Sequence, residues 1–304
     1  MDSPAVSIVV AAYNRSNVLS LAIASAVAQT FTDWEMLVVG DACTDDSEQV
    51  VKGFSDPRIA WENLRVNHGD QSGPNNHGVA HARGRYIAFL NQDDLWFPDH
   101  LERSVATLEA HTEAGGTFSP VVFVDPDGSV SMAPSWTGRY EPNRVIAPAT
   151  GWLLLRSTVR RVGPWRTRQE CYEAPPRDWL TRAWRCGVKL AQVPYVTVLV
   201  MSSGMRPDSY ADRDEYDEGR LWERMQKDPD LRESILAEIA LRSSAELNRP
   251  QPAEHARQAV KDAIVSAFGS RWIPAKTAVR YRRKGGLMDD LRRIRGLPPH
   301  EHAP

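Results

Sequence analysis

The chain has 304 residues, of which 42% are hydrophobic and 25% charged, and its formal net charge at pH 7 is −2. A membrane span requires about 18 unbroken apolar residues, and no stretch of the chain approaches that length. The near-neutral net charge disfavours a nucleic-acid-binding protein. Three cysteines without Cys-x-x-Cys spacing favour neither a disulfide framework nor a zinc site.

The first third of the chain alternates short apolar runs with segments of helical periodicity, the pattern of βαβ units. Met1 to Pro4 leads directly into the first apolar run without a basic region or a cleavage site, so we expect no secretory signal and a cytoplasmic location. Strands are expected at residues 6–13, 34–41, 58–64 and 85–94, helices at residues 17–29 and 47–54, and part of a helix at residues 78–83.

The second third continues with a helix at residues 98–111 and a strand at residues 117–125. A Pro-, Gly- and Trp-rich loop at residues 134–148 precedes an apolar run at 151–165, a helix at 178–187 and closing strands within 188–201. We expect one α/β domain with a mostly parallel, mixed sheet over residues 1–210. Residues 211–304 form a helical extension, with helices at 212–248 and 253–270 joined by a linker at 248–252.

Three aspartates fall where expected strands end, namely Asp41, Asp93 and Asp94. In open α/β sheets, ligands bind outside the carboxyl ends of the strands. Adjacent carboxylates repel each other, and a divalent cation relieves this repulsion. Mg²⁺ or Mn²⁺ is often held by one or two carboxylates together with phosphate oxygens. The alternative is that Asp93 caps the helix near Pro98 while Asp94 is solvated.

Four ordered blocks between Val6 and Tyr210 carry a family resemblance: "VSIVVAAYNR", "AIASAVAQTFTDWEMLVVGDACTDDS", "NNHGVAHARGRYIAFLNQDDLW" and "PPRDWLTRAWRCG". With these blocks the chain resembles glycosyltransferase family 2, the inverting, sugar-nucleotide-dependent enzymes of GT-A fold. The resemblance implies a Rossmann-like domain whose nucleotide-binding half covers about residues 1–98 and whose acceptor-binding half covers about residues 99–210.

The resemblance also implies a donor-binding set. Tyr13 stacks on the nucleobase with the backbone of Ala11 beside it, and Asp41 accepts a hydrogen bond from a uracil-type N3–H. Arg15 approaches the diphosphate, and Arg83 approaches the base or the phosphates.

The acidic pair has separate implied roles. Asp93 faces the ribose or the metal, and Asp94 binds the Mn²⁺ or Mg²⁺ that bridges the diphosphate. The family often has Asp where Asn91 stands, and Asp-Gly-Ser where this chain has Asp41, Ala42 and Cys43.

An inverting transfer also needs a general base, because the acceptor hydroxyl loses its proton as it attacks. The resemblance makes Asp178 the candidate, with Glu173 and Glu170 as alternatives because Arg177 replaces the acid that often precedes the base. An N-terminal cap of the helix at 178–187 is the structural alternative for Asp178.

Aromatic residues in the second half suggest an acceptor site. Trp96, Trp136 and Trp152 are our candidates, since indole faces pack well against sugars. The competing interpretation is that these side chains belong to the core.

The segment from Arg271 to Gly296 has nine Lys or Arg residues against two Asp, interleaved with apolar residues. Such a segment can lie on an anionic leaflet at the inner face of a membrane. A solvated basic helix is the alternative.

These observations predict a metal-assisted inverting glycosyltransferase. The donor is a UDP-, dTDP- or GDP-linked sugar, and the acceptor is a hydroxyl of a glycan, a lipid-linked glycan or a glycosylated metabolite. A metal-dependent nucleotidyltransferase and a non-catalytic sugar-nucleotide-binding protein are the alternatives.

Overall fold

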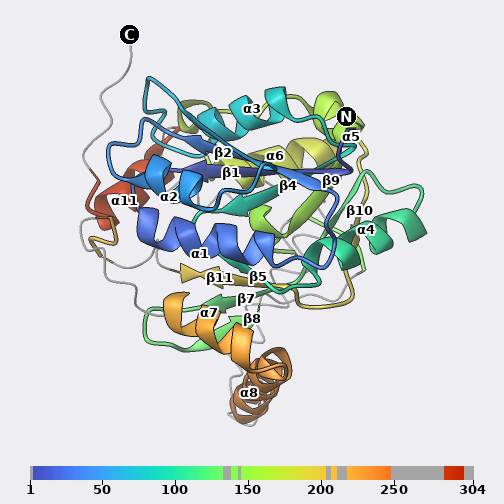
Figure 1. Ribbon diagram of the computed structural model, residues 1–304. Coiled ribbons are helices and arrows are strands. Elements are labelled where there is room, and N and C mark those ends of the chain that lie inside the picture. The colour runs from blue at the N-terminus through green and yellow to red at the C-terminus, as the bar shows by residue number, and fades with distance from the viewer. Residues whose placement is uncertain are drawn as a thin grey trace.

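The computed structural model describes residues 3–132, 138–142, 145–202, 207–210, 218–247 and 284–297. Its centre is a seven-stranded sheet of order β10-β6-β9-β4-β1-β2-β3 (Figure 1). The strands are β1 (Val6–Ala12), β2 (Trp34–Gly40), β3 (Ile59–Asn63), β4 (Tyr86–Asn91), β6 (Gly116–Phe118), β9 (Trp152–Leu155) and β10 (Leu190–Gln192).

Parallel pairing dominates this sheet. β1 pairs in parallel with β2 and β4, β2 with β3, and β6 with β10, whereas β9 is antiparallel to both of its neighbours. The predicted α/β fold with a mostly parallel, mixed sheet is therefore confirmed.

A second sheet has the order β5-β11-β7-β8. Its strands are β5 (Leu95–Trp96), β7 (Val121–Val124), β8 (Val130–Met132) and β11 (Val198–Met201). The single strand predicted at 117–125 is wrong, because β6 belongs to the large sheet and β7 to the small one. Pro120 lies between them and has no N–H to continue a ladder. The segment 188–201 divides in the same way around Pro194.

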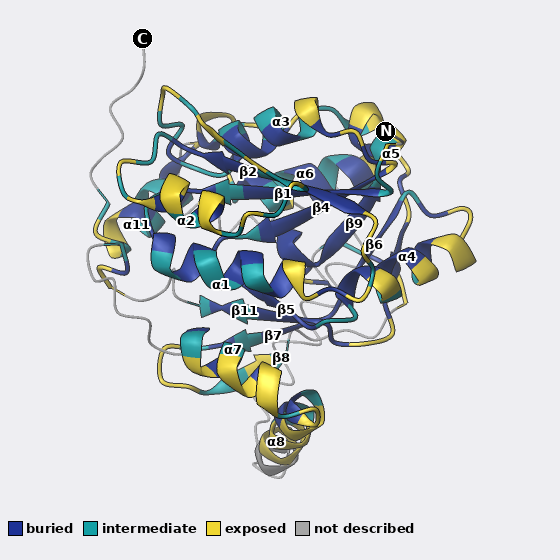
Figure 2. Ribbon diagram, in the orientation of Figure 1, coloured by how far each residue is buried: buried dark blue, intermediate teal, exposed yellow. Residues whose placement is uncertain are grey.

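Helices cover both faces of the large sheet (Figures 1 and 2). One face packs against α1 (Ser16–Val27), α2 (Ser47–Gly53) and α4 (His100–Ala110), and the other against α3 (Ser72–His81), α5 (Arg156–Val162) and α6 (Pro175–Arg185). The strand period of two explains this division, since Ile8 and Val10 join the first apolar cluster and Val9 joins the second.

Helix α3 begins at Ser72, six residues before the part of a helix predicted at 78–83. The Asp70 carboxylate accepts a hydrogen bond from the N–H of Ser72 at 2.7 Å and satisfies the first turn. Gly78 brings this helix against the sheet, since a Cβ there would lie 2.5 Å from Val9 Cγ1. The structure confirms a helix here. Its polar first turn has no apolar periodicity, so the sequence did not indicate where the helix begins.

The described part of the extension packs directly on the 1–210 domain. Helices α7 (Glu218–Lys227) and α8 (Leu231–Leu247) lie on the small sheet, where Leu221 and Ile235 join a cluster with Val122 and Leu199. Helix α11 (Gly286–Ile294) lies beside the edge where β1 and β2 end (Figure 1). The linker predicted at 248–252 and the helix predicted at 253–270 fall outside the described residues.

Aromatic rings fill the space between the large sheet and α6. Trp152 is fully buried, with ring centroids 5.6 Å from Trp165, 5.7 Å from Trp179 and 6.1 Å from Phe89. Since aromatic side chains bury large areas, this cluster is a major source of stability for the face under α6.

We therefore expect Trp152→Ala to lower the free energy of unfolding by about 3–5 kcal/mol, because the change removes a fully packed indole. Urea denaturation followed by circular dichroism measures this difference. Trp152→Phe, which keeps an aromatic ring, should lose less. Unchanged stability of Trp152→Ala would contradict the core assignment.

Candidate active site

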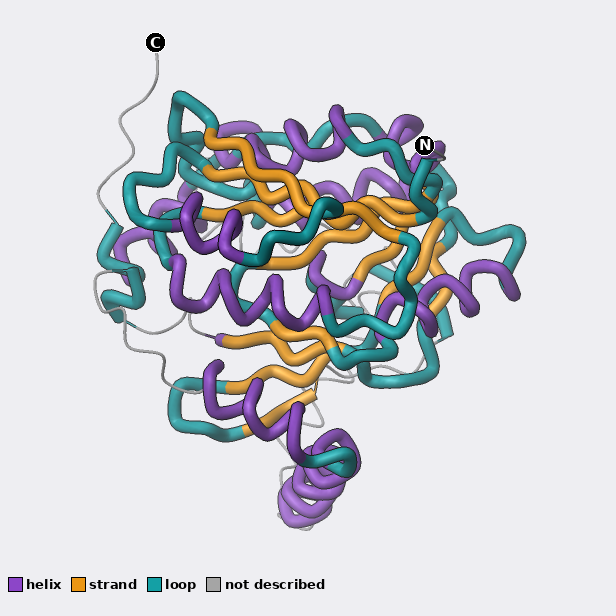
Figure 3. The backbone as a smooth tube through the Cα atoms, in the orientation of Figure 1, coloured by secondary structure: helices purple, strands orange, loops and turns teal. Residues whose placement is uncertain are grey.

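A cavity of about 230 Å³ lies at the carboxyl ends of β1, β2 and β4. The loops that follow β1 and β2 gather on this side of the molecule (Figure 3). Among the predicted residues, Ala11, Tyr13, Asp41 and Asp93 line the cavity. The remaining lining comes from β1, β4, α3, α6, α11 and several loops: Ala12, Asn67, Gly69, Asp70, Gln71, Pro74, Asn91, Gln92, Ala174, Pro175, Tyr210, Met288, Leu291, Arg292, Arg295 and Leu297.

Tyr13 is fixed by a glutamine that the sequence analysis did not single out. The backbone N–H of Tyr13 donates to Gln92 Oε1 at 2.8 Å, and Gln92 Nε2 donates to the Tyr210 hydroxyl at 3.2 Å. The two tyrosine rings lie 6.0 Å apart, centroid to centroid. Gln92 stands between Asn91 and Asp93, so its position at the strand end was the available signal.

The turn after β1 has backbone conformations that non-glycine residues rarely adopt. Asn14 has φ 34° and Arg15 has φ 151°. Asp45 accepts hydrogen bonds from the N–H groups of Arg15 and Ser16 at 2.9 and 3.1 Å, which holds the turn in place. Such strained residues concentrate at functional sites.

Arg15 is 2% exposed, and its guanidinium contacts two carboxylates. Nη1 lies 3.1 Å from Asp93 Oδ2 and Nη2 lies 3.5 Å from Glu218 Oε1. Among the described residues, the cavity lining includes Asp93 but not Arg15. The structure therefore places Arg15 behind Asp93, as its counter-charge, rather than at the position expected for a diphosphate ligand.

Asp41 is buried at the end of β2 and holds the loop that follows β3. It accepts hydrogen bonds from the N–H of His68 at 2.8 Å and of Gly69 at 3.1 Å, and its Oδ1 lies 2.9 Å from His68 Nδ1. Burial raises the pKa of the Asp41 carboxyl, and the contacts with His68 and Gly69 oppose that rise. Ala42, next to it, has φ 59° in a position that favours glycine.

The two adjacent aspartates have different environments. Asp93 lines the cavity, whereas Asp94 is 1% exposed and faces the small sheet. The Asp94 carboxylate accepts hydrogen bonds from the N–H of Met201 at 3.0 Å and from Asn91 Nδ2 at 2.7 Å. Burial, and then the charge of Asp93, raise the pKa of Asp94 well above its usual value. The expectation that Asp94 serves chiefly as the metal ligand is corrected, since it joins β4 to β11.

Asp93 is the carboxylate that fits a divalent cation. Among the residues that the structure describes, no three His, Cys, Asp or Glu side chains form a metal-binding group. One carboxylate is sufficient where phosphate oxygens supply most of the ligands. Asp93 does not cap the following helix, because α4 begins at His100 with Asp99 at its N-cap position.

Arg83 lies away from this cavity. It precedes β4 and ion-pairs with Glu35 at 2.6 Å, with 62% of its side chain exposed. β1 and β4 run in parallel, so Arg83 is at the amino-terminal edge of the sheet, about 20 Å from the edge that carries Asp93. Its predicted role at the base or the phosphates is therefore wrong.

Asp178 does not face the cavity either. Its carboxylate lies 2.9 Å from Arg182 Nε and 3.5 Å from Arg166 Nη1. It is not an N-cap, because α6 begins earlier, at Pro175, and Ala174 is the N-cap residue. Prolines at the first helical positions explain that start.

The alternatives to Asp178 differ from each other. Glu170 completes a capping box with Thr167, and the hydrogen bonds from Thr167 lower its pKa. Glu173 directly precedes Ala174, which lines the cavity, and ion-pairs with Arg177 at 3.1 Å. Burial raises the pKa of Glu173. Glu173 thus combines a position next to the cavity lining with a pKa raised by burial, which suits a proton acceptor.

The tryptophans proposed for the acceptor belong to the core. Trp96 and Trp152 are both fully buried, and their indole N–H groups donate to the carbonyls of Thr150 at 2.7 Å and Ala147 at 3.0 Å. A fully enclosed indole offers no face to a sugar, so these two predictions are corrected. Trp136 lies outside the described residues.

Helix α11 is the feature of this site that the sequence analysis missed. Met288 and Leu291 line the cavity, although the amphipathic pattern of this segment suggested contact with a membrane. The described part of the basic segment thus packs against the protein. Within the described residues, no helix is long and apolar enough to cross a membrane.

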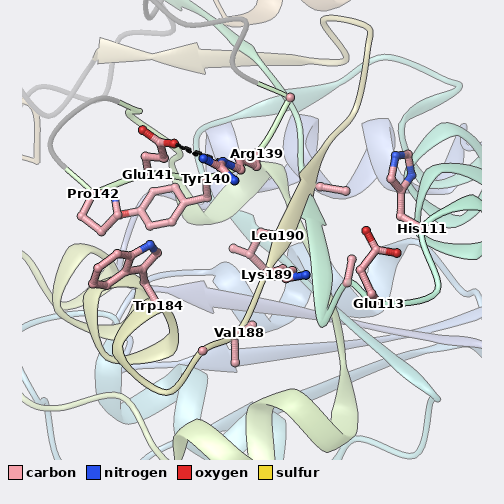
Figure 4. A pocket seen from close by; sticks show the side chains of 14 residues that line it. His111, Glu113, Arg139, Tyr140, Glu141, Pro142, Trp184, Val188, Lys189 and Leu190 are labelled. Atoms are coloured by element: carbon pink, nitrogen blue, oxygen red, sulfur yellow. Dashed lines mark hydrogen bonds and ion pairs between the residues drawn. The ribbon is translucent and has the colours of Figure 1, made fainter. Parts of the chain in front are cut away.

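A second cavity, of about 770 Å³, lies beside β10 and the start of β6. Figure 4 shows Tyr140, Pro142 and Trp184 on one side of it and His111 and Glu113 on the other. It contains none of the predicted site residues. We assign the chemistry to the smaller cavity, because the ends of parallel strands converge there.

The role of Asp94 can be tested in metal-free protein. Asp94→Ala leaves the Met201 N–H and the Asn91 amide without this acceptor, so we expect a loss of about 1–3 kcal/mol in the free energy of unfolding. Urea denaturation in EDTA measures it. A residue that serves only a cation would give no difference under these conditions.

Part of the chain that carries this site matches a known protein family. Residues 7–151 match the family model described as "Glycosyl transferase family 2". The E. coli UDP-Glc:alpha-D-GlcNAc-diphosphoundecaprenol beta-1,3-glucosyltransferase WfgD is 36% identical over 108 residues, which cover 36% of this chain and 42% of the relative. The chain thus spans less than half the length of this relative.

Two solved structures are similar in fold. S. aureus TarS in complex with UDP-GlcNAc superposes with a TM-score of 0.56 at 16% identity, covering 77% of this chain and 71% of TarS. The mannosyltransferase PcManGT from Pyrobaculum calidifontis, in complex with GDP-Man and Mn²⁺, gives 0.53 at 16% identity, covering 97% and 88%. These likenesses confirm the GT-A fold, and the family match identifies residues 7–151 as a glycosyltransferase family 2 region.

Proposed function

We propose that this protein transfers a sugar, with inversion, from a nucleoside diphosphate to a hydroxyl of a glycan or lipid-linked glycan. The observation that supports this most directly is the convergence of Tyr13, Asp41 and Asp93 on one cavity at the ends of β1, β2 and β4. An aromatic ring, a buried carboxylate and a second carboxylate on adjacent strand ends provide separate contacts for base, ribose and diphosphate.

The donor is a UDP-, dTDP- or GDP-linked sugar. TarS and PcManGT were solved with UDP-GlcNAc and GDP-Man, so likeness to them supports a nucleotide-sugar donor without selecting the base. Asp41 favours a base with an N–H donor. The name of the E. coli relative, with its diphosphoundecaprenol acceptor, supports a lipid-linked glycan, which would bring the protein to a membrane surface.

Asp93 would hold Mn²⁺ or Mg²⁺ together with the diphosphate oxygens. When bound, such a cation stabilises the negative charge that develops on the leaving diphosphate. Arg15 contributes from behind, since its buried guanidinium, 3.1 Å from Asp93, favours the ionised carboxylate that a cation requires. Tyr13 and Gln92 orient the donor.

We propose Glu173 as the general base, in place of Asp178. Two guanidinium groups hold the Asp178 carboxylate, whereas Glu173 stands next to the cavity lining with a pKa raised by burial. A raised pKa makes Glu173 the stronger proton acceptor. It would take the proton of the acceptor hydroxyl as that hydroxyl attacks the anomeric carbon.

A non-catalytic sugar-nucleotide-binding protein remains the second candidate. The observation that favours it is that Asp178, Glu173 and Glu170 are all absent from the described lining of the cavity. Binding needs the base, ribose and diphosphate contacts but no proton acceptor.

Product analysis with UDP-, dTDP- and GDP-sugars tests the activity. We expect release of free nucleoside diphosphate in the presence of Mn²⁺ and an acceptor extract, and its loss with EDTA or in Asp93→Asn. Release of pyrophosphate would indicate a nucleotidyltransferase. Binding of a nucleotide sugar without turnover under every condition would favour the binding protein.

The base assignment predicts a pH dependence. Glu173 accepts a proton only when ionised, so kcat should fall as the pH drops through a pKa above the usual value for glutamate. Glu173→Gln should lower kcat by about 10²–10⁴-fold while donor binding persists. Asp178→Asn is the matched control and should retain turnover. The opposite pattern in these two variants would restore Asp178 as the base.

A further inference from the structure

One arginine of helix α11, Arg292, points into the protein beside the donor cavity. Arg292 is 6% exposed, and its Nη1 donates to the carbonyl of Gly69 at 3.0 Å. The N–H of Gly69 in turn donates to Asp41 at 3.1 Å. Arg292 therefore ties α11 to the loop that holds the carboxylate proposed for base recognition.

Arg295 follows about one turn later and also lines the cavity. Its carbonyl accepts a hydrogen bond from the N–H of Tyr210 at 3.2 Å. The Tyr210 side chain connects to Tyr13 through Gln92. Arg295 thus stands at the strand-end side of the cavity that carries Tyr13 and Asp93.

Charge also favours these two arginines as contacts for an anionic ligand. The described lining contains three aspartates, Asp41, Asp70 and Asp93, and only two basic side chains, Arg292 and Arg295. A nucleoside diphosphate adds further negative charge. One divalent cation at Asp93 compensates part of this charge, and the remainder needs cationic side chains close to the phosphates.

We propose that α11 is a wall of the donor site, in which Arg295 binds the diphosphate and Arg292 positions the Asp41 loop. This inference rests on the proposed function. The planar guanidinium presents paired N–H donors that match phosphate oxygens, and it keeps its charge at any physiological pH. In this proposal the described part of the basic segment, residues 284–297, contacts the diphosphate, although its sequence pattern resembles that of a membrane-surface helix.

The same helix provides a matched control. Arg293 is adjacent in sequence, has 77% of its side chain exposed and pairs with Asp290 at 3.0 Å. It carries the same charge as Arg295 but projects away from the cavity. Removing either arginine changes the net charge of the protein equally.

Calorimetry on the full chain tests the role of Arg295. We expect Arg295→Ala to weaken the binding of whichever of UDP, dTDP and GDP the wild type binds by roughly tenfold to a hundredfold, the effect of a lost charge-assisted contact. Affinity for the corresponding nucleoside should not change. Arg293→Ala should bind both like the wild type. Arg292→Ala should weaken nucleoside and diphosphate alike, because its effect passes through the Asp41 loop.

Hydrogen exchange gives a readout that needs no variant. The bound nucleoside diphosphate should slow exchange of the α11 amides in the wild-type protein, and the nucleoside alone should do so less.

Each result decides between the claims. If the wild type binds none of the three diphosphates, the proposed function fails and the inference fails with it. If the wild type binds but Arg295→Ala binds equally well, or loses nucleoside and diphosphate alike, only the inference is overturned.

Discussion

The buried guanidinium of Arg15 is the point on which the site depends. A charge removed from water is costly unless opposite charges surround it, and Asp93 and Glu218 provide them from β4's end and from α7. Glu218 is 203 residues from Arg15 along the chain. This arrangement fixes the turn after β1, orients Asp93 toward the cavity and connects α7 to the strand ends that border the cavity. The positive φ values of Asn14 and Arg15 are the local cost of that geometry.

Asp94 makes a second connection of this kind. It is adjacent to Asp93 yet joins the large sheet to the small one through the N–H of Met201. The two carboxylates therefore have different roles, because Asp93 faces the cavity and Asp94 faces the interior. Repulsion between them is relieved on each side separately, by Arg15 for Asp93 and by hydrogen-bond donors for Asp94.

The sequence was sufficient to predict the central α/β fold and the strand ends that carry Asp41 and Asp93, because apolar periodicity is a local signal and the family resemblance pointed to the same strand ends. It failed where a residue's role depends on direction or on distant partners. Nothing in the local sequence distinguishes Asp94 from Asp93. Arg83 lies at the amino-terminal edge of the sheet because the chain returns to that edge between α3 and β4. Trp152 became core because α6 covers it. The amphipathic pattern of the basic segment at 271–296 did not reveal that Met288 and Leu291, in its described part, line the cavity.

The contact between Arg292 and Gly69 spans 223 residues of chain. During synthesis, β1, β2 and β4 leave the ribosome long before α11 does. The nascent domain can therefore form its sheet while the pocket still lacks one wall. If α11 is a wall of the donor site, as proposed above, full donor affinity is reached only after residues 284–297 have been made.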